Sequence, residues 1–142
     1  MVAANKINLK KVSAADPKLP EVMNFSMGSP TEDKILEIIS TYHDAGNELI
    51  GAFLEGGLIG VVGLLQSTEK ITIRHISVLP EFQRQGVGTL LLDYVKEHYS
   101  GHKIIAETDG ESVVFYLKSG FSCNSFEGKY ENLRYSCEFG SQ

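Results

Sequence analysis

The stretch ITIRHISVLPEFQRQGVGTLLLDYVKEHY, from Ile71 to Tyr99, contains two apolar patterns that predict different secondary structures. Its first part, Ile71 to Val78, is rich in β-branched residues and ends before Pro80, which cannot donate to a sheet, so it predicts a strand. The second part has an apolar stripe at helical spacing, at Val87, Leu90, Leu91 and Val95. Gly101 follows where a left-handed residue would end the helix.

The loop between them, Gln83-Arg84-Gln85-Gly86-Val87-Gly88, has the features of an anion site. The first N–H groups of a helix lack intrahelical partners and lie at the positive end of its dipole. Gly86 and Gly88 let the backbone approach a phosphate, and Arg84 adds a positive charge. A P-loop would need Gly-Lys-Ser/Thr and a dinucleotide fingerprint a third glycine, so neither fits. The loop therefore predicts a pyrophosphate site.

Gln83, Gly86 and Gly88 follow a strand that ends in Val-x-Pro. This arrangement resembles the pattern Gln/Arg-x-x-Gly-x-Gly/Ala of the GNAT superfamily of acyl-CoA-dependent N-acyltransferases. The resemblance covers most of the chain and is weakest before Asn47. It implies an α+β fold, with a mixed and mostly antiparallel sheet of about seven strands flanked by about four helices.

A second block, DGESVVFYLKSGF at residues 109–121, is similar to the family's Asn-x-x-Ala-x-x-Phe-Tyr-x-x-x-Gly-Phe. Tyr116 and Gly120 are in register with this pattern. Asp109 and Ser112 replace its usual Asn and Ala, which concerns contacts to substrate and water rather than the fold.

The remaining sequence predicts six further strands within a single domain spanning residues 1–142. These strands are expected at 7–12, 48–54, 58–65, 103–108, 121–126 and 133–139. Glu55-Gly56-Gly57 predicts a tight turn in a hairpin, because glycine readily takes positive φ.

Three other segments predict helices. Asp16 and Pro17 are expected to open a short helix, which Pro20 limits to a turn or two. Ser29 is expected to cap the next helix, in a capping box completed by Glu32, with the helix extending towards Gly46. The last is expected to begin at Asp109 or Gly110 and to end at Gly120.

The resemblance implies that the glycine loop binds acetyl-CoA, with the N–H groups of Gln85 to Thr89 on the pyrophosphate. The implied cofactor-binding residues of the loop are Gln83, Arg84, Gln85, Gly86, Val87, Gly88 and Thr89. Ile76 and Val78 would offer main-chain hydrogen bonds to the pantetheine arm, as a strand offers them to an added strand. The alternative is a glycine-rich helix start without a ligand.

Candidate catalytic groups follow from the chemistry of acetyl transfer. Attack by a neutral amine on a thioester expels a thiolate of pKa about 8.5, which a phenol of pKa about 10 can protonate. In the family a tyrosine at the position of Tyr116 does this, so Tyr116 is the candidate general acid, and a packed tyrosine is the alternative. Glu107 and Asp109 are the candidate bases, acting through a water, and Glu81 is less well placed.

The alternation of the central strand also singles out two basic side chains. It predicts one face carrying Thr72, Arg74, Ile76 and Val78, and another carrying His75 and Ser77. Arg74 is thus a candidate substrate-binding charge or, equally, a solvated arginine. His75 titrates near neutrality and could act as a base, but a hydrogen-bonded structural histidine is favoured.

Composition narrows the function classes. The chain has 142 residues, 42% of them hydrophobic and 22% charged, as in an ordinary globular domain. A formal net charge of −5 without a basic run argues against nucleic-acid binding and favours a cationic acceptor. A membrane span and a signal peptide are not evident, so a cytoplasmic location is expected. Cys123 and Cys137 are expected to be reduced core residues, with neither a disulfide nor a metal site.

The sequence therefore predicts an acetyl-CoA-dependent N-acetyltransferase in which a primary amine attacks directly. A small-molecule amine is expected, while a protein lysine or N-terminus, and a homodimer, are left open. The main alternative is a non-catalytic acyl-CoA-binding module, which Tyr116 argues against and Asp109 keeps open. A nucleotide-binding regulator is disfavoured, because a P-loop and a helix-turn-helix are both lacking.

Overall fold

The computed structural model describes residues 4–24, 31–129 and 132–140. Within these residues, seven strands form one sheet in the order β1-β2-β3-β4-β5-β7-β6. The strands are β1 (Ile7–Lys11), β2 (Asn47–Leu54), β3 (Gly57–Gln66), β4 (Lys70–Val78), β5 (Lys103–Thr108), β6 (Ser122–Glu127) and β7 (Leu133–Phe139). β4 and β5 pair in parallel, and the other neighbours are antiparallel. The predicted mixed, mostly antiparallel sheet is confirmed.

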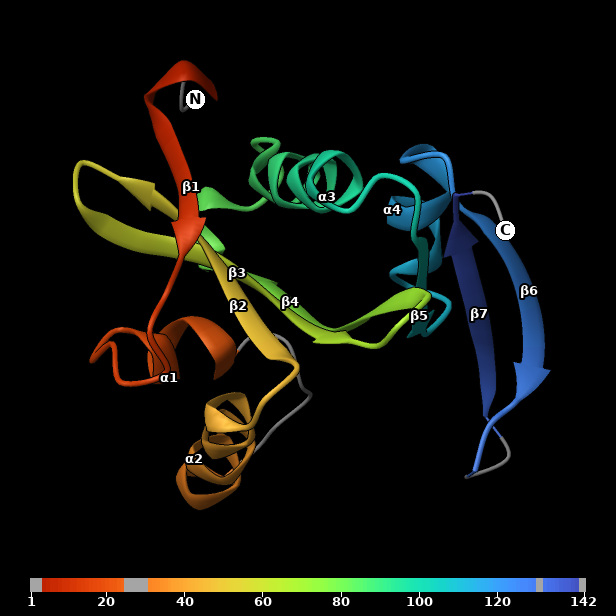
Figure 1. The fold of residues 1–142 in the computed structure, drawn as a ribbon, viewed down its shortest axis with the longest axis horizontal. Helices are drawn as coiled ribbons and strands as arrows, with labels where there is room; N and C mark the ends of the chain where they lie inside the picture. The colour runs from red at the N-terminus through yellow and green to blue at the C-terminus, as the bar shows by residue number, and fades with distance from the viewer. Residues whose placement is uncertain (1–3, 25–30, 130–131, 141–142) are drawn as a thin grey trace.

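The described part of the chain contains four α-helices, which cover the two faces of this sheet (Figure 1). They are α1 (Leu19–Met23), α2 (Glu32–Ser40), α3 (Val87–His98) and α4 (Val113–Lys118). Figure 1 shows α1 and α2 on one side and α3 and α4 on the other. The glycines of β3 allow this close packing: a Cβ on Gly63 would meet Tyr42, next to α2, and one on Gly60 would meet Val87 and Leu91 of α3. None of these helices, within the described residues, is long and apolar enough to cross a membrane.

The β2–β3 hairpin turns through two residues with positive φ, Glu55 at 51° and Gly56 at 84°. Two such residues in succession match the right-handed twist of the flanking strands. The predicted turn is confirmed, although Gly57 already belongs to β3.

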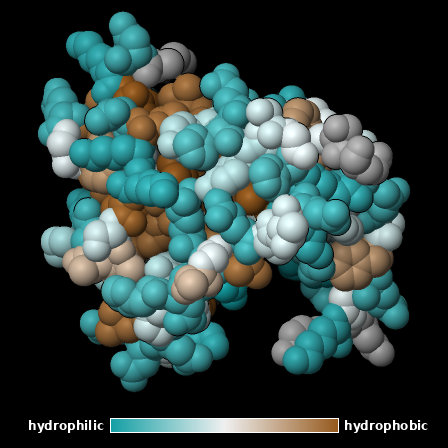
Figure 2. Space-filling model, in the orientation of Figure 1, coloured by the Kyte–Doolittle hydropathy of each residue, from teal (hydrophilic) through white to brown (hydrophobic). Residues whose placement is uncertain are grey.

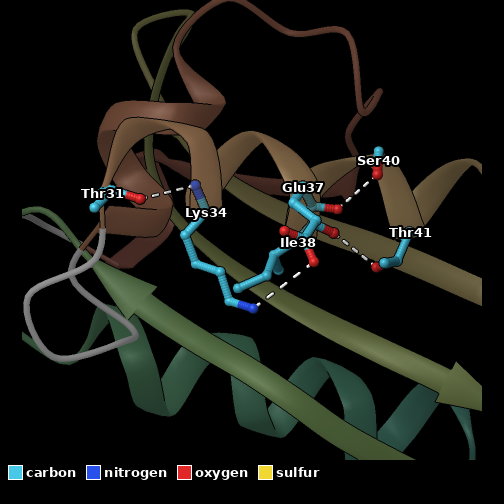
Figure 3. A network of polar contacts seen from close by, with 6 residues as sticks. All are labelled: Thr31, Lys34, Glu37, Ile38, Ser40 and Thr41. Atoms are coloured by element: carbon cyan, nitrogen blue, oxygen red, sulfur yellow. Dashed lines mark hydrogen bonds and ion pairs between the residues drawn. The ribbon is translucent and has the colours of Figure 1, made fainter.

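The beginning of α2 differs from the prediction. Thr31 is its N-cap, and the Thr31 hydroxyl accepts a hydrogen bond from the Lys34 N–H at 3.1 Å (Figure 3). Glu32 is therefore the first helical residue and cannot complete a capping box with Ser29. Ser29 itself lies outside the described residues. At the other end, a 3₁₀ turn (Thr41–His43) precedes Gly46, whose φ is 89°.

Two other helices begin later than predicted, because an aspartate forms a turn before each of them. The Asp16 carboxylate accepts the Lys18 N–H at 2.9 Å, and α1 then begins with Pro20 in its first turn, where proline is tolerated. The Asp109 carboxylate accepts the Ser112 N–H at 2.8 Å, and α4 follows. Both aspartates thus shape turns and do not begin the helices themselves.

The expectation of two reduced cysteines is wrong. Cys123 and Cys137 lie opposite each other on β6 and β7, with their Cα atoms 4.1 Å apart, and form a disulfide. The hairpin register creates this proximity, because it brings together two residues that are 14 positions apart in the sequence. Cys137 is buried, as predicted for a core residue, whereas Cys123 is half-buried.

The core lies between the sheet and its helices. α3 buries Val87, Leu91 and Val95 as its spacing predicts, but Leu92 is buried in place of Leu90, which is half-exposed. Figure 2 shows a mostly hydrophilic surface whose outline is indented between the part that carries α2 and the β6–β7 hairpin.

Candidate active site

The site begins where β4 and β5 separate. β4 pairs with β3 along its length, but with β5 only through Lys70–Ile73. Beyond this point β5 continues beside β7. Within the described residues, Arg74 to Val78 has no strand partner on the β5 side. The separation leaves a wedge lined on one side by the backbone of β4.

A β-bulge lies at the beginning of this wedge. The β3 partners pass from Ile73 directly to His75, so Arg74 is the extra residue. A bulge shifts the alternation of a strand by one residue. The prediction that Thr72 and Ile76 share a face is therefore wrong: Thr72 lies on the α2 side with His75, and Ile76 lies on the α3 side.

The glycine loop has the geometry expected of an anion site. Arg84 and Gly86 have φ angles of 62° and 85°, and Gly86 is the N-cap of α3. The first bond of the helix runs from the Leu90 N–H to the Gly86 carbonyl at 3.0 Å. The N–H groups of residues 87–89 precede this bond and lie at the positive end of the helix.

Two glutamine side chains of the loop donate hydrogen bonds to backbone carbonyls that precede the loop. The Gln83 side-chain nitrogen donates to the Val78 carbonyl at 2.9 Å, and that of Gln85 donates to the Glu81 carbonyl at 3.0 Å. Gln83 thereby ties the loop to the last residue of β4. These hydrogen bonds hold the loop in shape, and the cofactor contacts of the two residues stay predictions.

A cavity of about 460 Å³ lies against the loop. It is lined by Ile76, Ser77, Val78, Phe82, Gln83, Arg84, Gly86, Val87, Gly88, Thr89, Glu111, Ser112 and Phe115. Of the predicted loop residues, Gln85 alone does not line it. The end of β4 and the beginning of α3 thus face one space, which is large enough for part of a cofactor.

A second cavity, of about 300 Å³, adjoins the first through Ile76, Ser112 and Phe115. It is lined by Ile73, Arg74, His75, Ile76, Glu107, Thr108, Asp109, Ser112, Phe115, Tyr116 and Arg134. The structure therefore brings together every predicted catalytic residue and Arg74. Glu81 lines neither of these two cavities.

Tyr116 packs between two phenylalanines in the wall of the second cavity. Its ring centroid lies 5.2 Å from that of Phe115 and 5.3 Å from that of Phe121, and 4% of the residue is exposed. Burial raises the pKa of Tyr116 to about 12. The phenol therefore keeps its proton at neutral pH, and burial makes it a weaker acid than an exposed tyrosine.

His75 is a hydrogen-bonded histidine, as favoured from the sequence. Its Nδ1 lies 2.6 Å from the hydroxyl of Tyr42, a residue that the sequence did not assign to the site. Burial, assisted by the positive charge of Arg74, lowers the pKa of His75 to about 4. His75 is therefore neutral at physiological pH.

Arg134 is the second residue that sequence reasoning missed. It lies on β7 and lines the second cavity together with Arg74. Its position in the sequence carries no motif, and only the pairing of β7 with β5 brings it to the site. Within the described residues, no group of three His, Cys, Asp or Glu side chains could hold a metal ion.

This sheet, wedge and loop together define an acetyltransferase fold. The family of the acetyltransferase (GNAT) domain matches residues 29–136, and the chain belongs to this family. A search of curated proteins gives no match in sequence.

Solved structures share this fold at low sequence identity. An aminoglycoside 6′-N-acetyltransferase complexed with coenzyme A has a TM-score of 0.81 at 12% identity, over 93% of this chain and 96% of that chain. The PaiA N-acetyltransferase of Thermoplasma acidophilum, in complex with coenzyme A, has a TM-score of 0.70 at 19% identity, over 94% of this chain and 99% of that chain. The ribosomal-protein-S18-alanine N-acetyltransferase of Escherichia coli has a TM-score of 0.76 at 12% identity, over 96% of this chain and 96% of that chain.

Proposed function

We propose that this protein transfers an acetyl group from acetyl-CoA to a primary amine by direct attack. The observation that carries this proposal is the junction of the two cavities at the wedge between β4 and β5. One cavity contains the anion loop, and the other contains a buried phenol and two carboxylates. Membership of the acetyltransferase family supports the same reaction.

The first cavity would hold the coenzyme. Its pyrophosphate would bind the N–H groups at the beginning of α3, near the Arg84 guanidinium. The pantetheine arm would run along β4, whose backbone at Ile76 and Val78 lacks a strand partner on this side within the described residues. Two solved structures of this fold are complexes with coenzyme A, which supports coenzyme A as the ligand.

The chemistry needs one proton to leave the amine and one to reach the sulfur. The amine nitrogen forms a bond to the thioester carbonyl carbon, and the carbon–sulfur bond then breaks. Tyr116 would donate its proton to the leaving thiolate, and a water held by Glu107 or Asp109 would accept the proton of the amine. The products are an N-acetylated amine and the free thiol of coenzyme A.

Two measurements test this proposal. Thermal shift should show that acetyl-CoA and coenzyme A raise the melting temperature, by about 5–10 °C at a hundredfold excess over Kd, whereas ATP and NAD do not. Thiol release should then follow the addition of an accepted amine. Stabilisation by ATP or NAD alone would contradict the proposal, and acetyl-CoA binding without turnover on a broad amine panel would favour the non-catalytic module.

A further inference from the structure

Two arginine side chains share the space in which the acceptor would lie. Arg74 and Arg134 both line the second cavity and a third one of about 350 Å³, which also includes Glu107. The bulge of β4 presents Arg74 to this space, since bulges redirect side chains. Glu107 pairs with Ser136, and Arg134 lies two positions before Ser136, so Glu107 and Arg134 share a face of the sheet.

Both guanidinium groups are available to a ligand. The ion pairs found among the described residues all use lysine as the cation, so neither arginine pairs with a described carboxylate. Two positive charges lining the same cavity repel each other, and a bound anion relieves that repulsion. A guanidinium group also matches the planar geometry of a carboxylate through two parallel hydrogen bonds.

The second cavity is lined by charged groups of both signs. Arg74 and Arg134 contribute two positive charges, and Glu107 and Asp109 contribute two negative charges. The third cavity keeps both arginines but only Glu107 of the carboxylates. The space therefore suits a molecule with a cationic end and an anionic end better than a purely cationic one.

We propose that the acceptor is a small amino acid, whose carboxylate binds Arg74 and Arg134 while its amine lies beside Asp109 and Tyr116. This inference rests on the proposed acetyl transfer and names its substrate class. It replaces the expectation of a cationic acceptor, which came from the net charge of the whole chain rather than from this cavity. The volume of about 300 Å³ is at the lower end of ligand sites, consistent with a small acceptor.

A matched panel of amines tests this assignment. Thiol release is measured with L-amino acids and with ω-amino acids such as 4-aminobutanoate, each beside its methyl ester, which keeps the amine and removes the negative charge. We expect kcat/KM for the best free acid to exceed that of its ester at least tenfold, the size of one charge-assisted hydrogen bond. Equal or higher kcat/KM for the esters would overturn the inference while leaving acetyl transfer intact.

Variants of the two arginines test whether these side chains cause the preference for the free acid over its ester. Arg74→Gln and Arg134→Gln should each raise KM for the free acid about tenfold or more, and should thereby reduce the ratio of kcat/KM between the free acid and its ester. Lys118→Gln is the control, because Lys118 is an exposed cation at the end of α4. A preference for the acid that survives in both arginine variants would overturn the inference, and coenzyme A binding by calorimetry verifies that each variant is folded.

A binding measurement separates this inference from the proposed reaction. The free acid should raise the melting temperature of the coenzyme A-bound protein, whereas its ester should not. Loss of this shift in the arginine variants would support the anion site even if no amine were acetylated. Absence of the shift in the parent protein with every acid of the panel would refute the anion site whether or not other amines react.

Discussion

The Tyr116→Phe substitution tests the proposed general acid. The ring packs between Phe115 and Phe121 in a buried position, so phenylalanine keeps these contacts and removes one hydroxyl group. A lost general acid should lower kcat about 100-fold, which corresponds to about 2.7 kcal/mol of activation free energy. The free energy of unfolding should change by about 1 kcal/mol or less.

The pH dependence of kcat gives a second test of the role of Tyr116. Because burial raises the pKa of Tyr116 to about 12, the phenol keeps its proton well above pH 10. We expect kcat of the parent to rise as the amine loses its proton and then to stay level up to about pH 11. A tyrosine with the ordinary pKa of about 10 would instead lose activity above about pH 10. The Phe variant should follow the same rise at a lower level.

Thiol release measured against pH, with one accepted amine at saturation, provides the assay. Tyr94→Phe is a matched control, because Tyr94 lies on α3, stacked on His98, and lines neither proposed cavity. Calorimetry should give similar coenzyme A affinities for all three proteins. Equal kcat in the parent and in Tyr116→Phe would remove Tyr116 from the mechanism.

Two further predictions concern the loop and β4. Gly88→Val should lower coenzyme A affinity more than tenfold by calorimetry, because even a Cβ there would lie 3.3 Å from Phe115 in the wall of the cavity; Gly57→Ala, at a site with ordinary contacts, should not. An affinity within a few-fold of the parent would exclude the loop from the site. The pKa of His75 is about 4 in the folded protein and about 6.5 when unfolded, so its contribution to stability is complete above pH 6.5 and is lost as the pH falls towards 4. Urea unfolding should show that the free energy of unfolding of the parent falls by about 2 kcal/mol between pH 6.5 and pH 4, and that His75→Gln lacks this loss. An identical pH dependence in the two proteins would contradict this prediction.

The sequence predicted the elements whose signals are local. The change from β-branched residues to a helical stripe between Ile71 and Tyr99 corresponds to β4 and α3, and the bounds predicted for β5 and β7 agree with the structure. These predictions succeed because strand and helix periods differ over a few residues. Helix beginnings were less predictable, because Thr31 and Ser29 are both good caps and only the fold selects one.

Strand pairing caused the larger errors. The disulfide between Cys123 and Cys137 depends on the β6–β7 register, which the two cysteines do not reveal on their own. The bulge at Arg74 depends on how β4 pairs with β3, and it invalidates simple alternation along the strand. Both features are properties of two strands together, so a single strand cannot predict them.

The sequence by itself determined the glycine loop at the beginning of α3 and the position of Tyr116, because each lies within a short motif. Only the tertiary structure decided what surrounds them. The wedge exists because the parallel pairing of β4 with β5 stops at Ile73 and Ala106. The pairing of β5 with β7 on its other edge brings Arg134 to the cavity that contains Arg74. A hydrogen bond between Tyr42 and His75 likewise joins the 3₁₀ turn after α2 to β4. Such contacts depend on strand order and register across the sheet, and these are set by the packing of the whole chain.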